Sequence, residues 1–143
     1  MSIRPFVVFP ENRHASLNVV GEQITVLASK EATHGYEVFL QEGPEGSGPV
    51  PHSHPWDESF FVIRGNIEFA IEEKPMIATP GTLVHLPAGT AHWFRFGKGG
   101  GQMVSMTGAG SKASSMFNDI DSVGSQDVEM LRNACERNDL RIL

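Results

Sequence analysis

The stretch that decides the fold runs from residue 46 to residue 65 and reads GSGPVPHSHPWDESFFVIRG. His52 and His54 are two residues apart, so in an extended strand both imidazoles project from one face with Cα atoms about 6.5 Å apart. Pro55 interrupts regular strand pairing and allows the chain to be re-aimed, so that Glu58 turns back toward that face. This stretch therefore predicts two nitrogen ligands and one carboxylate for a single metal ion.

A fourth ligand is expected from a distant strand, at His92. The Pro87-Ala88-Gly89 turn comes just before His92, and Phe94 and Phe96 follow with the same strand parity. Three nitrogens and one carboxylate suit Fe, Mn, Ni, Co, Cu or Zn better than Ca or Mg. The predicted ligands of one divalent transition metal ion are His52, His54, Glu58 and His92.

Short alternating apolar stretches surround these residues and predict β-strands. Three of them place apolar side chains at Ile24, Val26 and Ala28, at Tyr36, Val38 and Leu40, and at Ile67, Phe69 and Ile71. Segments rich in glycine and proline, such as 42–48 and 79–81, predict tight turns between the strands. Each strand is expected to bury one face, which leaves Glu37 on a solvated face.

The spacing of these residues resembles the two motifs of the cupin family. The first motif is matched at every fixed position, by Gly46, His52, His54, Glu58 and Gly65. The second motif is matched as far as its metal-binding histidine, by Gly81, Pro87, Gly89 and His92. Four residues beyond His92, where the family often has Asn, this sequence has Phe96.

The resemblance implies an all-β fold: an antiparallel jelly-roll (cupin) β-barrel with a short C-terminal helix. It places the metal deep inside and lets a small-molecule ligand or substrate enter through one open end. The barrel is expected over about residues 15–108, within a single domain that spans residues 1–143. Many relatives are homodimers, which implies a homodimer here, through an apolar face of the N-terminal strands or through Met116 and Phe117.

A C-terminal helical extension is expected over about residues 111–138. Residues 111–117 predict a short helical turn. Residues 126–137 predict a helix packed on the outside of the barrel, because Val128, Leu131 and Cys135 fall at positions i, i+3 and i+7. Ser125 is expected to cap this helix, and Asp127 is placed favourably at its N-terminal dipole.

Composition excludes several classes of protein. A length of 143 residues suits one domain, and a formal net charge of −6 argues against binding to nucleic acid. The apolar run Phe6–Phe9 is too short for the core of a signal peptide, and no segment approaches the length needed to cross a bilayer. With Cys135 as the single cysteine no internal disulfide forms. We therefore expect a cytoplasmic protein without a membrane partner.

Other polar residues near the motifs are expected to lie outside the metal shell. His85 has the opposite parity to Val84 and Leu86 and is expected to point outward, and Asp57 points away from Glu58 in an extended chain. The loop residues His14 and His34 are expected on the surface. For Phe60, Phe94 and Phe96, which share the parity of the ligands, a role in the core and a role as substrate-pocket walls both remain open.

Four protein ligands around a metal that accepts six leave two positions for a substrate, or for a substrate oxygen and dioxygen. Glu58 is the expected catalytic base, since a carboxylate can exchange between metal and proton. The similarity to quercetin dioxygenase-like cupins implies a metal-dependent oxygenase acting on a small enolisable or phenolic compound. A metal-dependent isomerase or lyase, and a non-catalytic small-molecule-binding cupin, are the alternatives.

Overall fold

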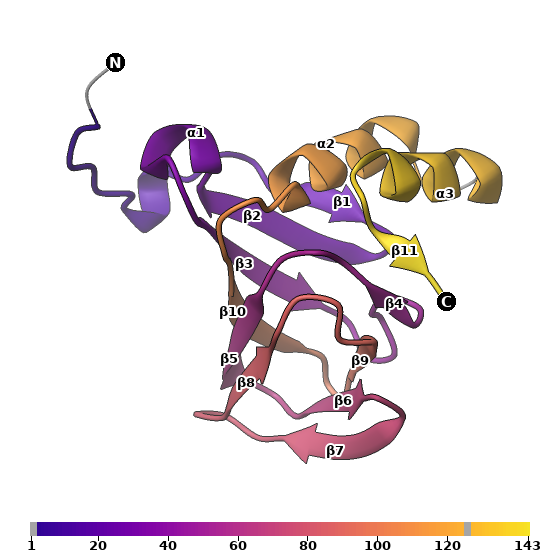
Figure 1. The fold of residues 1–143 in the computed structure, drawn as a ribbon. Coiled ribbons are helices and arrows are strands. Elements are labelled where there is room, and N and C mark those ends of the chain that lie inside the picture. Colours follow the sequence, from indigo (N-terminus) through magenta and orange to yellow (C-terminus); the bar gives the residue numbers. More distant parts are fainter. Residues whose placement is uncertain (1–2, 125–126) are drawn as a thin grey trace.

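The computed structural model describes residues 3–124 and 127–143, which form two antiparallel sheets and a few short helices (Figure 1). The first sheet has six strands in the order β1-β2-β3-β10-β5-β8. These strands are β1 (Leu17–Val19), β2 (Glu22–Ala28), β3 (Glu37–Gly43), β10 (Gly101–Thr107), β5 (Glu58–Arg64) and β8 (Leu83–Leu86). Because β10 inserts between β3 and β5, this sheet depends on pairing between distant parts of the sequence.

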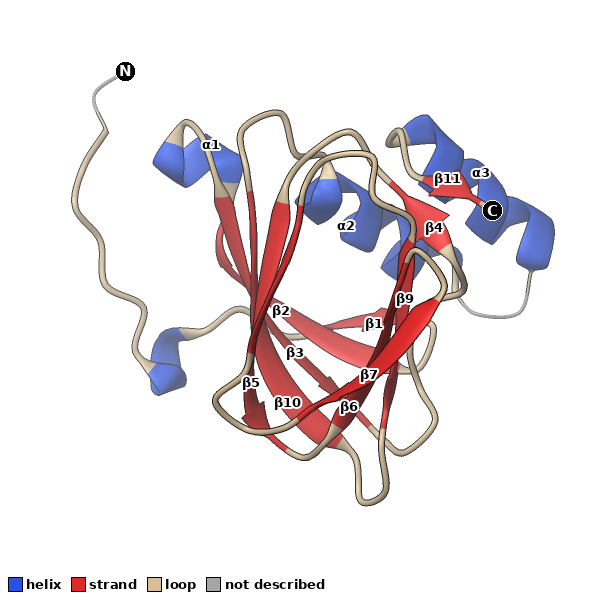
Figure 2. Cartoon of the chain, turned by 60° about the horizontal axis from the view of Figure 1, so that its bottom comes forward, coloured by secondary structure: helices blue, strands red, loops and turns tan. Residues whose placement is uncertain are grey.

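The second sheet has five strands in the order β11-β4-β9-β6-β7. These are β11 (Arg141–Ile142), β4 (His52–Ser53), β9 (His92–Phe96), β6 (Ile67–Ile71) and β7 (Lys74–Ala78). Figure 2 shows the two sheets lying opposite each other, with α2 and α3 at one end. The predicted antiparallel all-β architecture with added helices is confirmed at this level.

A first core cluster fills the space between the two sheets. It contains side chains at alternate positions of both, as expected when each strand buries one face. Its buried members are Phe60, Val62, Ile67, Phe69, Ala78, Val84, Leu86, Phe94, Phe96 and Met103. Aromatic contacts are frequent here: the rings of Phe60 and Phe69 have centroids 5.3 Å apart, and those of Phe94 and Phe96 5.8 Å apart.

A second core cluster joins the first sheet to the C-terminal helices. Phe39 of β3 meets the ring of Phe117 edge-on, with centroids 5.0 Å apart. Met116, Phe117 and Ile120 are buried in this cluster. Met116 and Phe117 are therefore core residues, and the expectation that they form a dimer interface is wrong, because their face of the helix turns inward.

The C-terminal extension contains two helices where one helix and a short turn were expected. Helix α2 (Ala113–Val123) is longer than the predicted turn because its apolar face continues to Ile120, and it ends at Gly124 with φ 80°. Helix α3 (Val128–Arg137) begins after Asp127, whose side chain accepts a hydrogen bond from Met130 N at 3.0 Å. Ser125, the expected cap, lies outside the described residues.

Strand β3 buries Leu40, as the sequence pattern indicated, but it also buries the opposite face. Glu37, Phe39 and Gln41 are almost completely buried, whereas Tyr36 is 55% exposed. The prediction that Glu37 is solvated is therefore wrong. The apolar run Val38-Phe39-Leu40 fits either parity. The buried polar residues Glu37 and Gln41 both make hydrogen bonds.

Glu37 ties α2 to the first sheet. Its carboxylate accepts hydrogen bonds from Ser111 Oγ (2.9 Å) and from the backbone N of Ser114 (3.1 Å), and also from Ser114 Oγ. It also accepts from the backbone N of Lys30 (3.1 Å), just after β2 and at the start of the short helix α1 (Lys30–Thr33). The N-cap residue Lys112 makes no side-chain cap bond. Glu37, on β3, instead accepts from a backbone N–H at the start of α2.

The N-terminal segment from Ile3 to Phe9 leads into a 3-10 helix at Pro10–Asn12 and runs outside the two sheets (Figure 1). Its apolar side chains, among them Phe6 and Val7, are exposed. In the described ranges no helix combines the length and the apolar character needed to cross a membrane.

Replacing Glu37 by Ala should destabilise the protein by about 3 kcal/mol, because several buried donors lose a charged acceptor at once. Urea unfolding measured by circular dichroism gives the free energy of unfolding. Glu31→Ala, at an exposed glutamate of α1, is the control and should change it by less than about 0.5 kcal/mol. Equal losses in the two variants would contradict this role of Glu37.

Candidate metal centre

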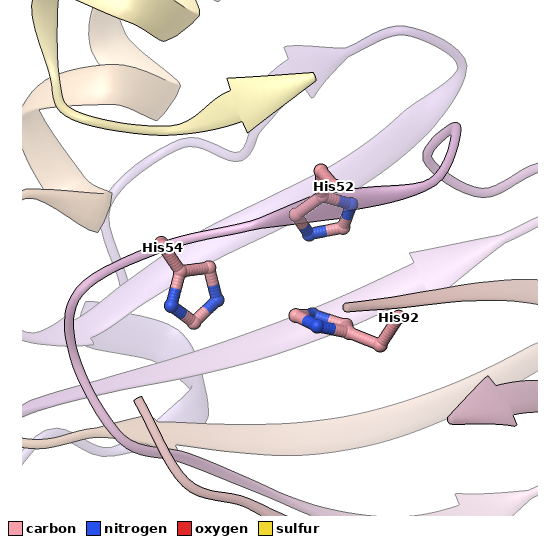
Figure 3. A group of neighbouring side chains, drawn as sticks. All are labelled: His52, His54 and His92. Carbon is pink, nitrogen blue, oxygen red and sulfur yellow. The ribbon is translucent and has the colours of Figure 1, made fainter. Parts of the chain in front are cut away.

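Three histidines from two neighbouring strands converge between the sheets. His52 lies on β4 directly opposite His92 on β9, and His54 follows β4 by one residue. Ring centroids are 4.2 Å apart for His52 and His92, 5.2 Å for His54 and His92, and 5.9 Å for His52 and His54. Figure 3 shows the three rings pointing toward one another. One ring nitrogen from each lies within 4.8 Å of the others, a spacing at which one ion could be held.

Each of these rings is fixed by the same kind of hydrogen bond. The Nδ1 atoms of His52, His54 and His92 contact the backbone carbonyls of Val50 (2.7 Å), Trp56 (2.9 Å) and Thr90 (2.9 Å). A carbonyl oxygen only accepts, so Nδ1–H is the donor in all three. This bond sets the tautomer and leaves Nε2 as the nitrogen without a proton, which is how metal-binding histidines are usually oriented.

Burial favours the neutral form of two of the rings. Desolvation, together with the neighbouring His92, lowers the pKa of His52 from 6.5 to about 3, and desolvation also lowers the pKa of His92. The Nε2 atom of His92 is fully buried and has no hydrogen-bond partner among residues 3–124 and 127–143. A buried nitrogen lone pair without a partner is costly in a protein alone, and a metal ion would satisfy it. The residues present therefore fit a bound metal ion.

Glu58 places its carboxylate beside two of the three histidines. It is the first residue of β5, is 7% exposed, and places Oε1 3.0 Å from His54 Nε2 and 3.9 Å from His92 Nε2. The contact between His54 Nε2 and Glu58 Oε1 is therefore within hydrogen-bond distance. A cation placed here could be bound by both atoms.

The ligand loop is tied to the turn that precedes His92. Asp57 is exposed and accepts a hydrogen bond from the backbone N of Ala88 (2.8 Å), while Gly89 N donates to His54 O (2.9 Å). Gly89 has φ 83°, as required at the third position of a type II turn. Asp57 therefore positions the loop from outside the histidine cluster. Trp56 is buried and stacks on the His54 ring at 4.5 Å.

A cavity of about 560 Å³ lies beside the histidines, within the range typical of small-molecule sites. His52, His54 and Glu58 line one part of it, and residues of α2 and α3 line another. Of the three phenylalanines singled out in the sequence, Phe60 and Phe94 line the cavity, whereas Phe96 packs behind Phe94 in the core.

Two polar side chains of the cavity were missed by the sequence reasoning. Glu22, on β2, is 4% exposed and lines the cavity. Gln41, on β3, also lines it and donates to Ser105 Oγ at 2.7 Å. Glu22 lies two residues before the buried Ile24, so its strand parity could have identified it. The wall is therefore less uniformly apolar than expected.

Burial raises the pKa of Glu22 from 4.5 to about 8, and the negative charge of Glu58 adds to the increase, while Arg95 opposes it. The Oε1 atom of Glu22 has no hydrogen-bond partner within the described part of the chain.

The remaining histidines lie away from the cluster. His14, His34 and His85 are exposed, as predicted. His85 Nδ1 is 2.8 Å from Ser59 Oγ on the outer face of the first sheet.

Comparison with known protein families supports the motif resemblance. A family model described as "Cupin domain" matches residues 38–104. Quercetin 2,3-dioxygenase of Bacillus subtilis is 29% identical over 94 residues, which cover 64% of this chain. The chain spans 27% of the length of that relative.

Solved structures agree on the fold. KdgF from Halomonas sp. superposes with a TM-score of 0.70 at 16% identity, covering 78% of this chain and 99% of that protein. An RmlC-like cupin from Shewanella frigidimarina gives 0.69 at 15% identity, covering 80% and 99%. A predicted oxalate decarboxylase from Thermotoga maritima gives 0.66 at 18% identity, covering 73% and 99%. At these identities the likeness concerns the fold alone.

The histidine cluster predicts how single substitutions affect metal content. His52→Ala and His92→Ala should each lower the stoichiometry of bound transition metal well below one per chain, because each removes one of the three converging nitrogens. Elemental analysis after gel filtration measures it, and the exposed His85→Ala is the control. Stoichiometric metal in both cluster variants would refute this site.

Glu22 predicts a dependence of stability on pH in chelator-treated protein. Its folded pKa lies above the unfolded value, so between pH 4.5 and about 8 the unfolded state binds fewer protons and stability falls as the pH rises. Glu22→Gln removes this loss of stability. The free energy of unfolding of the variant should exceed that of the wild type by on the order of 2 to 3 kcal/mol at pH 7, and the difference should shrink toward pH 4.5.

Urea unfolding at several pH values provides the measurement. Glu31→Gln, at an exposed glutamate, serves as the control and should follow the wild type at every pH. A constant difference between Glu22→Gln and wild type across this range would show that Glu22 is not held neutral by burial.

Proposed function

We propose that this chain is a cupin similar to the quercetin dioxygenase-like members of that family, and that it is a metal-dependent oxygenase acting on a small enolisable or phenolic compound. The observation that carries the proposal is the cluster of three buried histidines, oriented alike by backbone carbonyls, at the side of a cavity of about 560 Å³. The dioxygenase relative supports the choice of reaction.

The proposed metal ligands are the Nε2 atoms of the three histidines and the carboxylate of Glu58. Nitrogen and carboxylate donors suit one divalent transition metal ion, namely Fe, Mn, Ni, Co, Cu or Zn. When bound, such an ion supplies Lewis acidity that stabilises an enolate or phenolate oxygen.

Glu58 is the proposed base. Its carboxylate can accept a proton from the substrate, and no other group is needed to hold that proton. The stacked ring of Trp56 and the hydrogen bond to Trp56 O hold the neighbouring His54 ring in place. Glu58 and His54 are both buried, which limits the access of water to them.

Phe60 and Phe94 are the proposed walls of the substrate pocket. Their rings are buried, lie 5.6 Å apart between centroids and line the cavity. Phe96 contacts Phe94 edge-on and supports its ring from behind. Flat aromatic surfaces of this kind favour a flat, largely apolar substrate.

Further features of the proposal concern the protein as a whole. We infer that residues 1–143 act as one cupin domain whose sheets close into a jelly-roll barrel, and that the protein works in the cytoplasm on a small molecule. We also infer a homodimer that covers the exposed apolar side chains of the N-terminal segment, such as Phe6, Val7 and Phe9.

Oxygen uptake tests the proposed reaction. The protein loaded separately with Fe(II), Mn(II), Ni(II) or Co(II) should consume oxygen with at least one member of a panel of flavonols and β-diketones. Glu58→Gln should lower the rate at least about 100-fold, because the amide cannot accept the substrate proton. His85→Ala is the control. Absence of oxygen uptake with all four metals and the whole panel would contradict the proposal.

The same panel incubated in an anaerobic chamber separates the alternatives. Product formed without oxygen would instead indicate an isomerase or lyase. Stoichiometric binding with no product under either atmosphere would indicate a non-catalytic binding protein.

A further inference from the structure

The cavity contains a second buried carboxyl group, Glu22, that the proposed reaction does not use. It reaches the cavity from β2, on the first sheet, whereas His52, His54 and His92 lie on or beside strands of the second sheet. Glu22 therefore lines the same cavity as His52 and His54, but from the other sheet.

The backbone before Glu22 sets its position. The two-residue turn between β1 and β2 has Val20 at φ 50° and Gly21 at φ 91°. Positive φ is costly for a β-branched residue such as Val20. Val20 is half-exposed at the margin of the cavity, and Glu22, two residues on, is buried inside it.

Comparison with Glu37 shows that the two buried carboxyl groups differ in their hydrogen bonding. Both carboxyls are buried in the first sheet, but Glu37 accepts hydrogen bonds from Ser111 and Ser114. The Oε1 atom of Glu22 has no such partner in residues 3–124 or 127–143. An unsatisfied buried polar atom destabilises a fold, so its presence calls for a partner from outside the chain.

The charges around Glu22 favour its neutral form. Glu58 has the same sign, and Arg95, the opposing cation, is engaged elsewhere: its Nη1 donates to Pro49 O (2.6 Å) and Phe94 O (2.8 Å). Burial raises the pKa of Glu22 to about 8, consistent with a carboxylic acid at neutral pH. A neutral carboxyl offers an O–H donor. It therefore suits a ligand with an acceptor oxygen better than a ligand with an ammonium group.

We propose that Glu22 recognises the ligand of this cavity by donating a hydrogen bond from its carboxyl O–H to a carbonyl, enolate or phenolate oxygen. The apolar body of that ligand packs against Met116, Phe117 and Leu131 of the two C-terminal helices, which line the same cavity. Glu22 is thus a specificity-determining residue. The inference rests on the proposed function only in taking this cavity as the substrate site.

Binding of matched probes to the chelator-treated full chain tests this role. α-Tetralone and tetralin share a fused-ring skeleton and differ in one carbonyl oxygen, and aminotetralin carries a cation instead. Isothermal titration calorimetry near pH 6 should give the wild type an affinity for α-tetralone about tenfold above that for tetralin, as expected for one buried hydrogen bond.

Variants at position 22 identify the group responsible. Glu22→Met, of similar length, should abolish the carbonyl preference, whereas Glu22→Gln, whose amide still donates, should retain part of it. Glu31→Gln is the control and should keep the wild-type preference. Because both position-22 variants remove an unpaired buried carboxyl, each should unfold at or above the temperature of the wild type at pH 7.

Three results would overturn the inference: no carbonyl preference in the wild type, an unchanged preference in Glu22→Met, or tighter binding of aminotetralin than of α-tetralone that depends on Glu22. The assay involves neither metal nor oxygen. A carbonyl preference that depends on Glu22, found together with no oxygen uptake, would therefore contradict the proposed reaction while supporting the role of Glu22.

Discussion

The pairing of β4 with β9 at His52 and His92 is the constraint on which the site depends. Strand β4 has only two residues, and it is held between β9 and the terminal strand β11. This pairing places two imidazoles on opposite strands, and backbone carbonyls then fix the direction of each ring. Because the orientation comes from the backbone, the free nitrogens converge before any ion arrives, which is the preorganisation that metal sites need.

The C-terminal helices turn this cluster into the wall of a cavity. Helix α2 is held against the first sheet by Phe117 packing on Phe39 and by the bonds of Glu37 to the start of the helix. Strand β11, after α3, returns the chain to the edge of β4. The same C-terminal segment therefore supports the histidine strand and lines the cavity beside it, so stability and ligand binding share elements.

The histidine cluster could be predicted from the sequence because the spacing of His52 and His54 and the resemblance to the two cupin motifs, which adds His92, point to the same site. His52 and His54 are two residues apart, so in a strand they lie on one face. The Pro87-Ala88-Gly89 turn predicts that a strand begins near His92. The face of β3 could not be predicted, since Val38, Phe39 and Leu40 satisfy either parity. The decision depends on hydrogen bonds from Ser111 and Ser114, which are more than 70 residues away from Glu37.

The burial of Glu22 could be predicted from the sequence only in part. Its parity with Ile24 was visible in the sequence, but a glutamate at a strand end is ordinarily solvated, whereas this one is buried beside a cavity that α2 and α3 also line. Helix α2 was also underestimated, because its apolar face continues to Ile120 beyond the segment 111–117. In both cases tertiary packing overrode a reasonable local expectation.

The central claim is that the three histidines bind one metal ion through their Nε2 atoms. The most direct test is a crystal structure of the Zn²⁺-loaded protein with anomalous diffraction recorded at the zinc edge. One strong anomalous peak is expected about 2.0–2.1 Å from Nε2 of His52, His54 and His92. A peak at another site, or no peak within coordination distance of these atoms at full zinc loading, would contradict the claim.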